Sequence, residues 1–217
     1  MNTTTIAERS VLRALASRQI VYTKEVNRLI AACLVVSERT GNFDPRVGDI
    51  LAEAGLSNQA FYRHFQSKEE LLLAVLDQGG RQLDQYLRKR MAAQTSPVDK
   101  VRAWVRGFAA QAIRPKAAAA TRPFMFPSAR LYERFPEEIP VVEQLYRDSL
   151  TAALELAVGA GQVRADLNAA CDSVFIYDLV KTWLERQLRA DPLPPETEIA
   201  RRADKLEDFI MRAIGVS

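Results

Sequence analysis

The chain has 217 residues, of which 48% are hydrophobic and 26% charged, and its formal net charge is +3. This composition is typical of a globular protein with a sizeable core and excludes an intrinsically disordered chain. The sequence has no apolar signal segment at its N-terminus and no run of about 18 apolar residues. We therefore expect a cytoplasmic protein with no membrane partner.

The first predicted element is a short helix in a polar N-terminal arm, residues 1–20. Thr5 and Glu8 have the spacing of a capping box, in which each side chain accepts a hydrogen bond from the backbone N–H of the other residue. The arm carries three basic residues, which are Arg9, Arg13 and Arg18.

A second helix is predicted from Thr23, whose hydroxyl can cap its start, to Gly41, which ends it. Its apolar residues recur at helical spacing on one face. We expect Cys33, on this face, and Cys171 to be small core residues of a reducing compartment, without a disulfide. The apolar face consists of Val26, Ile30, Cys33 and Leu34.

A short amphipathic helix is predicted over residues 45–54. Asp44 can cap it, and Pro45 suits its first position because the N–H that proline lacks would have no partner there. Gly55 stands where a left-handed residue is needed to end the helix. The apolar face consists of Val47, Ile50, Leu51 and Ala54.

A further helix begins almost at once, because Ser57 can cap it two residues after Gly55. Two helices with so short a connection must cross steeply, as in a helix-turn-helix. Phe61 and Phe65 are four residues apart and point inward with Leu56. The opposite side carries residues that can hydrogen-bond the base edges or phosphates of DNA. They are Asn58, Gln59, Tyr62 and Arg63.

A longer helix is predicted from residue 68 to about residue 91. Ser67 and Glu70 form a capping box that opens it. The pair Gly79-Gly80 predicts a bend or a flexible point, because each glycine inside a helix costs about 1 kcal/mol relative to alanine.

This part of the chain resembles the DNA-binding signature of the TetR (tetracycline-repressor) family of bacterial transcription regulators. The resemblance covers residues 24 to 75, and its two blocks stand at the spacing that the family uses. The matching segments are Ile50–Ala54, Gly55–Ser57, Phe61–Phe65 and Ser67–Leu72.

Two positions depart from the common pattern of the family. Arg46 stands where a threonine often caps the first helix of the motif, and Leu51 stands where a small alanine is usual. We expect Arg46 to replace a hydroxyl–phosphate contact by a charged one, and Leu51 to alter the packing of the two helices. Both departures leave the residues that face the groove in place.

The resemblance implies a homodimeric repressor that binds a palindromic operator in double-stranded DNA and is released by a small-molecule effector. Its major-groove residues would be Asn58, Gln59, Ala60, Tyr62 and Arg63. Its phosphate contacts would come from Arg46, Ser57, His64 and Lys68. Two interpretations of the N-terminal arm stay open, namely a loosely packed terminal segment and a basic arm on the DNA backbone.

The rest of the chain also reads as helical, and no stretch shows the period-two alternation of a strand, so the predicted fold class is all-α. Further helices are predicted at residues 97–114, 139–160, 168–190 and 196–214, with short ones among the prolines of residues 115–140. The predicted organisation is an arm (1–20), a three-helix helix-turn-helix DNA-binding domain (21–67) and a larger helical ligand-binding and dimerisation domain (68–217).

The helix at residues 168–190 is apolar nearly all round between Val174 and Val180, so it must be covered on more than one side. A partner subunit is a natural cover, which predicts dimerisation through this helix and the one at residues 139–160. Asp178, in the middle of this helix, needs a polar partner or faces a cavity.

An effector pocket is predicted in the second domain, with the kinked region of residues 115–140 as a wall. The effector is expected to be largely apolar, although core packing alone explains most of the aromatic residues. The candidate ligand-binding residues are Trp104, Phe108, Phe126, Tyr132, Tyr146, Phe175 and Asp178.

The sequence offers little for catalysis. Its single histidine, His64, lies inside the predicted reading helix, and neither a metal-ligand spacing nor a glycine-rich phosphate loop occurs. We therefore expect no enzyme, metal or cofactor. Two alternatives remain, namely a helix-turn-helix used only for protein contact and a small-molecule-binding or enzymatic helical protein without a DNA function.

Overall fold

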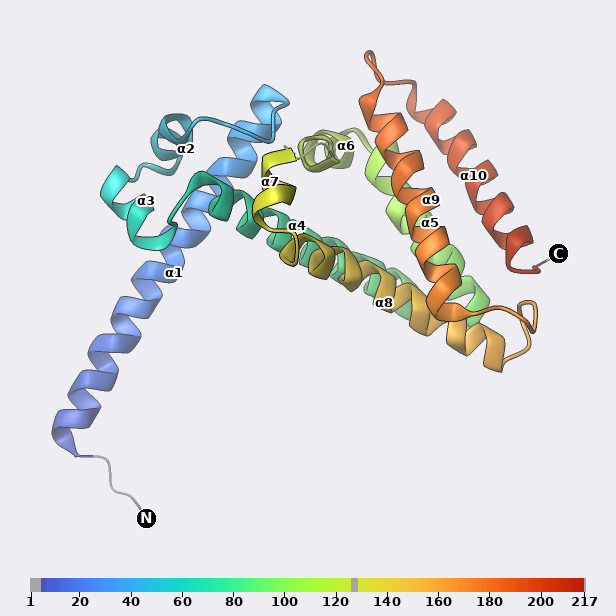
Figure 1. Ribbon diagram of the computed structural model, residues 1–217, viewed down its shortest axis with the longest axis horizontal. Helices are drawn as coiled ribbons and strands as arrows, with labels where there is room; N and C mark the ends of the chain where they lie inside the picture. The colour runs from blue at the N-terminus through green and yellow to red at the C-terminus, as the bar shows by residue number, and fades with distance from the viewer. Residues whose placement is uncertain (1–4, 126–128, 217) are drawn as a thin grey trace. The chain divides into compact units, whose positions relative to one another are not determined.

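The computed structural model describes residues 5–125 and 129–216 (Figure 1), and throughout these residues every regular element is a helix. The prediction of an all-α fold is confirmed. The chain divides into two compact units, 1–75 and 76–217, which are called the head and the body below. The division falls inside a helix, about two turns beyond the predicted boundary at residue 67.

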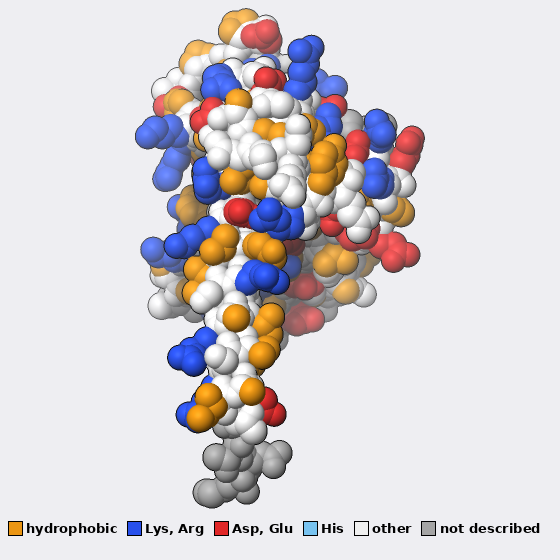
Figure 2. Space-filling model, turned by 90° about the vertical axis from the view of Figure 1, so that its left-hand side faces the viewer, with side chains coloured by type: hydrophobic (Ala, Val, Ile, Leu, Met, Phe, Trp, Pro, Cys, Tyr) orange, Lys and Arg blue, Asp and Glu red, His pale blue; other side chains and the backbone are white. Residues whose placement is uncertain are grey.

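The head begins with one long helix, α1 (Ile6–Thr40), where two separate helices were predicted. The capping box of Thr5 and Glu8 is present, and Gly41 ends the helix with a φ of 66°. The predicted helix start at Thr23 is wrong, because no glycine or proline interrupts the chain there and extending a formed helix costs little. Basic and apolar side chains alternate along its exposed N-terminal half (Figure 2).

Helices α2 (Val47–Ala54) and α3 (Asn58–His64) form the predicted helix-turn-helix. The predicted cap by Asp44 and Pro45 is wrong, since α2 starts two residues later and Arg46 holds the N-cap position without a side-chain hydrogen bond. Asp44 pairs instead with Lys68, at 2.5 Å. Gly55 ends α2 with a φ of 59°, as predicted.

Helix α4 (Lys68–Ala92) begins in the head and ends in the body. The backbone N–H of Glu70 donates to Ser67 Oγ at 3.2 Å, and the Glu70 carboxylate accepts from the N–H of Gln66 at 2.6 Å. The predicted capping box is therefore present in a form displaced by one residue. The first turns of α4 complete the head core, whose buried residues include Leu29, Cys33, Ile50, Phe61, Phe65, Leu71, Leu72 and Val75.

The body is built around helix α5 (Pro97–Ile113), which packs against the three long helices that follow it (Figure 1). These are α8 (Glu138–Gly159), α9 (Ala169–Arg189) and α10 (Glu196–Ala213). Between α5 and α8 lie α6 (Pro115–Thr121), the 3-10 turn η1 (Arg122–Met125) and α7 (Ala129–Arg134). The predicted break of this region into short helices is confirmed.

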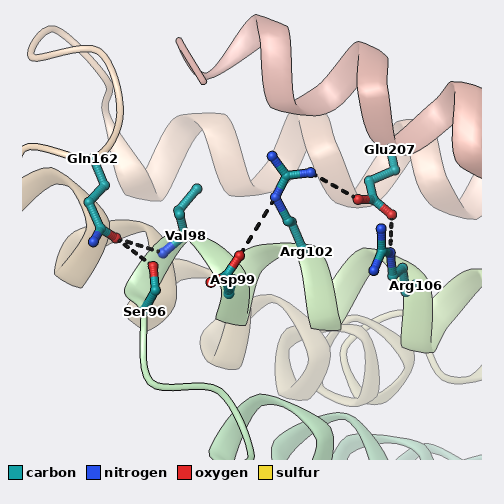
Figure 3. A network of polar contacts seen from close by, with 7 residues as sticks. All are labelled: Ser96, Val98, Asp99, Arg102, Arg106, Gln162 and Glu207. Atoms are coloured by element: carbon teal, nitrogen blue, oxygen red, sulfur yellow. Dashed lines mark hydrogen bonds and ion pairs between the residues drawn. The ribbon is translucent and has the colours of Figure 1, made fainter. Parts of the chain in front are cut away.

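Two polar contacts connect α5 to distant parts of the body (Figure 3). Gln162, after α8, accepts hydrogen bonds from Ser96 Oγ at 3.1 Å and from the N–H of Val98 at 2.9 Å, which satisfies a donor at the start of α5. Glu207 of α10 is buried and receives the guanidinium groups of Arg102 and Arg106. The carboxylate is thus neutralised inside the body.

Helix α4 continues without a break through Gly79 and Gly80. A Cβ atom on Gly80 would lie 2.5 Å from Val142 Cγ1 and 2.8 Å from Tyr146 Oη, both on α8. The glycine therefore allows two helices to approach closely, which offsets its low helix propensity.

Replacing Gly80 by alanine should destabilise the body by about 1–2 kcal/mol, because overpacking costs about 1–3 kcal/mol and the gain in helix propensity returns only part of it. Thermal unfolding followed by circular dichroism measures the effect. Gly159→Ala is the matched control, since nothing lies within 4 Å of a Cβ atom at that position. Equal melting temperatures for the two variants would mean that Val142 and Tyr146 move aside freely.

Candidate nucleic-acid interface

The outward side of α3 carries four exposed side chains able to meet DNA. They are Asn58, Gln59, Tyr62, which is 63% exposed, and Arg63, whose side chain is 38% exposed. Phe61 and Phe65 lie buried on the opposite side and brace the helix, as predicted. Ser57 Oγ accepts a hydrogen bond from the backbone N–H of Ala60 at 3.2 Å and so caps the start of α3.

Ala60 does not belong to the outward side. Its exposed fraction is 5%, so the prediction that it faces the groove is wrong. In a helix the residues at positions i, i+1, i+4 and i+5 share a side, and counted from Asn58 these are the residues of the outward side. Ala60 is at position i+2 and therefore points to the opposite side, toward the head core.

The C-terminal end of α3 is held by a carboxylate from α1. Glu25 Oε2 lies 2.6 Å from His64 Nε2 and 3.2 Å from Arg63 Nη1. The His64 side chain is only 7% exposed, so the predicted phosphate contact of His64 is replaced by this internal pair. The hydrogen bond from His64 and the charge of Arg63 lower the pKa of Glu25, although partial burial opposes them.

Tyr22, one turn before Glu25, completes the contact. Its ring meets that of His64 edge-on with centroids 5.1 Å apart, and the Arg63 guanidinium lies 5.5 Å from the Tyr22 ring centroid. On the next turn of α1, Arg28 donates to the carbonyl oxygen of Ala54 at 2.5 Å and so caps the C-terminal end of α2.

Tyr22, Glu25 and Arg28 were not among the residues predicted from the sequence. A signal was available, since Tyr22 and Glu25 fall on the same face of the helical pattern as Leu29 and other buried residues of α1. A charged residue on a core-facing stripe requires a partner.

The remaining predicted phosphate contacts lie around α2 and α3. Arg46 is exposed at the start of α2, and Ser57 is exposed at the start of α3. Lys68 is partly buried and paired with Asp44. Arg46 and Ser57 are thus accessible to a phosphate, whereas Lys68 would have to share its charge with Asp44.

The body contains an aromatic cluster of Trp104, Phe108, Tyr146 and Tyr177. Trp104 stacks on Phe108 at 5.1 Å between ring centroids, and Phe108 meets Tyr146 and Tyr177 edge-on at 5.7 and 5.9 Å. Trp104 Nε1 donates to the carbonyl oxygen of Tyr146 at 3.1 Å. Burial raises the pKa of both tyrosines, so their hydroxyl groups stay protonated.

A polar group lies at the edge of the aromatic cluster. Lys181 Nζ is 2.5 Å from Glu143 Oε1 and 5.9 Å from the Tyr177 ring centroid. Burial raises the pKa of Tyr132, and the charges of Lys181 and Glu143 also act on it. Three predicted ligand-binding residues, Trp104, Phe108 and Tyr146, are therefore brought together, and Tyr132 lies near the polar group.

Three other predictions for the body differ from the structure. Phe175 is 65% exposed and Asp178 is also exposed, so within one chain Asp178 faces solvent and not a cavity. Only one side of α9 is buried, through Ile176, Tyr177, Val180 and Leu184. Cys171 is exposed, contrary to prediction, while Cys33 is buried, which raises the pKa of its thiol to about 11. Phe126 lies outside the described residues.

Among the described residues, none of the helices combines the length and the apolar character that spanning a membrane requires. The same residues contain no group of three or more histidine, cysteine, aspartate or glutamate side chains placed to hold a metal ion.

The head thus defines a helix-turn-helix protein with an exposed second helix. The family model for bacterial regulatory proteins of the tetR family matches residues 46–75, which contain α2, α3 and the start of α4. This segment is thus similar to the DNA-binding segment of the tetR family. Among curated proteins, no sequence matches.

Solved structures with the same fold extend over almost the whole chain. The fatty acid degradation regulator FadR from Bacillus halodurans has a TM-score of 0.72 at 16% identity, covering 89% of this chain and 97% of its own. A TetR-family regulator from Rhodococcus sp. has a TM-score of 0.71 at 18% identity, covering 86% and 98%. FadR from Bacillus subtilis, in complex with stearoyl-CoA, has a TM-score of 0.68 at 15% identity, covering 84% and 96%. At these identities the likeness establishes the fold.

Proposed function

We propose that the protein is a cytoplasmic transcription repressor that binds a palindromic operator as a homodimer and leaves it when a small-molecule effector binds the body. The observation that carries this proposal is the exposed side of α3, where Asn58, Gln59 and Tyr62 project from a helix braced by buried phenyl rings. A second helix of this kind fits the major groove and reads base edges.

In the proposed complex Asn58, Gln59 and Tyr62 meet base edges, while Arg46 and Ser57 hold phosphates. Amide side chains pair well with adenine edges, and backbone contacts fix the register of the helix. The head contains almost equal numbers of basic and acidic residues. Affinity therefore depends on the placement of a few groups and on doubling the contacts through a dimer.

We propose that the dimer forms through α8 and α9, which pack side by side. Both helices expose large apolar side chains, and neighbouring apolar residues on a surface are typical of a protein interface. A two-fold pairing would present two heads to half-sites about 34–36 Å apart. The exposed apolar residues are Val141 and Leu156 on α8 and Phe175 and Leu179 on α9.

The effector is proposed to be largely apolar and to bind beside the aromatic cluster, with Tyr132, Lys181 and Glu143 at its polar end. A protein of this fold, FadR from Bacillus subtilis, binds stearoyl-CoA. To release DNA, the effector must bind one conformation of the dimer more tightly than the conformation that fits the operator.

Replacing Tyr62 by alanine should weaken binding to the operator by at least about tenfold, because a lost base or phosphate contact costs about 1–3 kcal/mol. Fluorescence anisotropy with DNA from the promoters of its own and the neighbouring genes measures the affinity.

Phe209→Ala is the matched control, since Phe209 is an exposed aromatic residue of the body, 56% exposed. Failure of the unmodified protein to bind any of these duplexes would refute the DNA function and favour a helix-turn-helix used for protein contact. Turnover of a substrate by the purified protein would favour the enzymatic alternative.

A further inference from the structure

The contact between α1 and the end of α3 carries an inference about DNA specificity, which rests on the function proposed above. Arg63 is the cation of the outward side of α3, and its side chain is 38% exposed. Its guanidinium is held on one side by the Glu25 carboxylate at 3.2 Å and on another by the Tyr22 ring at 5.5 Å. The Arg63 side chain is thus accessible to solvent, but its orientation is fixed by these two contacts.

The carboxylate that holds Arg63 is itself fixed. Glu25 lies on the continuous helix α1, has a side chain only 17% exposed, and bonds His64 at 2.6 Å with the same oxygen. His64 is in turn packed against Tyr22. The orientation of Arg63 is therefore determined by three side chains, all within the head.

This arrangement changes what Arg63 offers to DNA. A guanidinium has five N–H donors, and Glu25 accepts hydrogen bonds from only one of its nitrogens, Nη1, while its charge offsets that of Arg63. A free arginine close to DNA takes any phosphate, which raises affinity for every sequence alike. An arginine with a neutralised charge and fixed direction gains most from a base edge that matches its remaining donors.

We propose that Glu25 is a specificity-determining residue, which positions Arg63 for a base edge of the operator and withholds it from the phosphates of other DNA. Glu25 acts through Arg63 and is a positioning residue. The continuity of α1 contributes to this arrangement, because the helix runs without interruption through the predicted start at Thr23 and so holds both Tyr22 and Glu25.

The test compares Glu25→Gln with Glu38→Gln, measuring affinities for operator and non-operator duplexes over a range of salt concentrations. Glu38 is an exposed carboxylate on the same helix, so the control removes the same charge without touching α3. Glu25→Gln should bind non-operator DNA more tightly, with a plot of log K against log salt steeper by about 0.9 per subunit. The ratio of operator to non-operator affinity should fall about tenfold, whereas Glu38→Gln should keep it. Equal effects of the two variants would overturn the proposal.

Arg63→Gln provides a second test, which removes an exposed group and leaves the core intact. The variant should lose operator affinity but keep the salt dependence on non-operator DNA, because the unmodified Arg63 does not hold a phosphate there. A salt slope lower by about 0.9 per subunit would identify Arg63 as a phosphate contact and refute the proposal. In the Arg63→Gln background, Glu25→Gln should no longer change the affinity ratio. An unmodified protein that binds operator and other DNA equally would refute the proposed function itself.

Discussion

Replacing Phe175 by glutamate should convert the protein to a monomer and reduce operator affinity by more than about 100-fold, since each half-site contact would be made without its twin. Phe175 is the most exposed large apolar side chain of α9, at 65%. A carboxylate in its place would be desolvated without a partner if α9 met its copy. Sedimentation velocity gives the oligomeric state, and anisotropy with operator DNA gives the affinity.

The matched control for this variant is Phe209→Glu, which places the same charge on an exposed aromatic position of α10. It should leave both the mass and the affinity unchanged. A Phe175→Glu protein that still sediments as a dimer would place the interface elsewhere on the body.

Removing both arginines that hold Glu207 should destabilise the body by about 3–5 kcal/mol, the cost of a buried charge that loses its partners. The Glu207 side chain is 3% exposed, and Arg102 Nη1 lies 3.1 Å from its Oε1 while Arg106 holds its Oε2 (Figure 3). In the double variant Arg102→Ala, Arg106→Ala the carboxylate must either stay buried and charged or take up a proton. Urea unfolding followed by tryptophan fluorescence measures the loss, and Trp104 reports directly from the body core.

The pair Arg201 and Arg202 on α10 allows a close control for this effect. Both hold the carboxylate of Glu198, whose pKa their hydrogen bonds lower to about 2. The double variant Arg201→Ala, Arg202→Ala removes the same charge but leaves a carboxylate that is 31% exposed, which water can solvate. It also removes the hydrogen bond from Arg202 Nη1 to Gln187 Oε1. Its unfolding midpoint should fall much less than that of the Arg102→Ala, Arg106→Ala variant. Equal unfolding midpoints for the two double variants would show that the burial of Glu207 adds nothing to the stability that its arginine contacts provide.

The sequence by itself determined the elements whose physical causes are local. Gly55 adopts the left-handed conformation that ends α2, and Ser57 supplies the cap of α3 within a few residues. The outward position of Tyr62 and the inward position of Phe61 follow from helical periodicity alone. For this reason the helix-turn-helix and the family resemblance were both readable before any fold was known.

Only the tertiary structure decided which polar groups are available. Arg63, His64 and Lys68 are close in sequence and alike in chemistry, yet Glu25 and Asp44 reach them from positions more than twenty residues away. Asp178 and Phe175 are exposed because α9 packs through its other side, which a helix apolar nearly all round does not reveal. Local patterns fix where a side chain points along its own helix, whereas its partners depend on which distant helix packs against it.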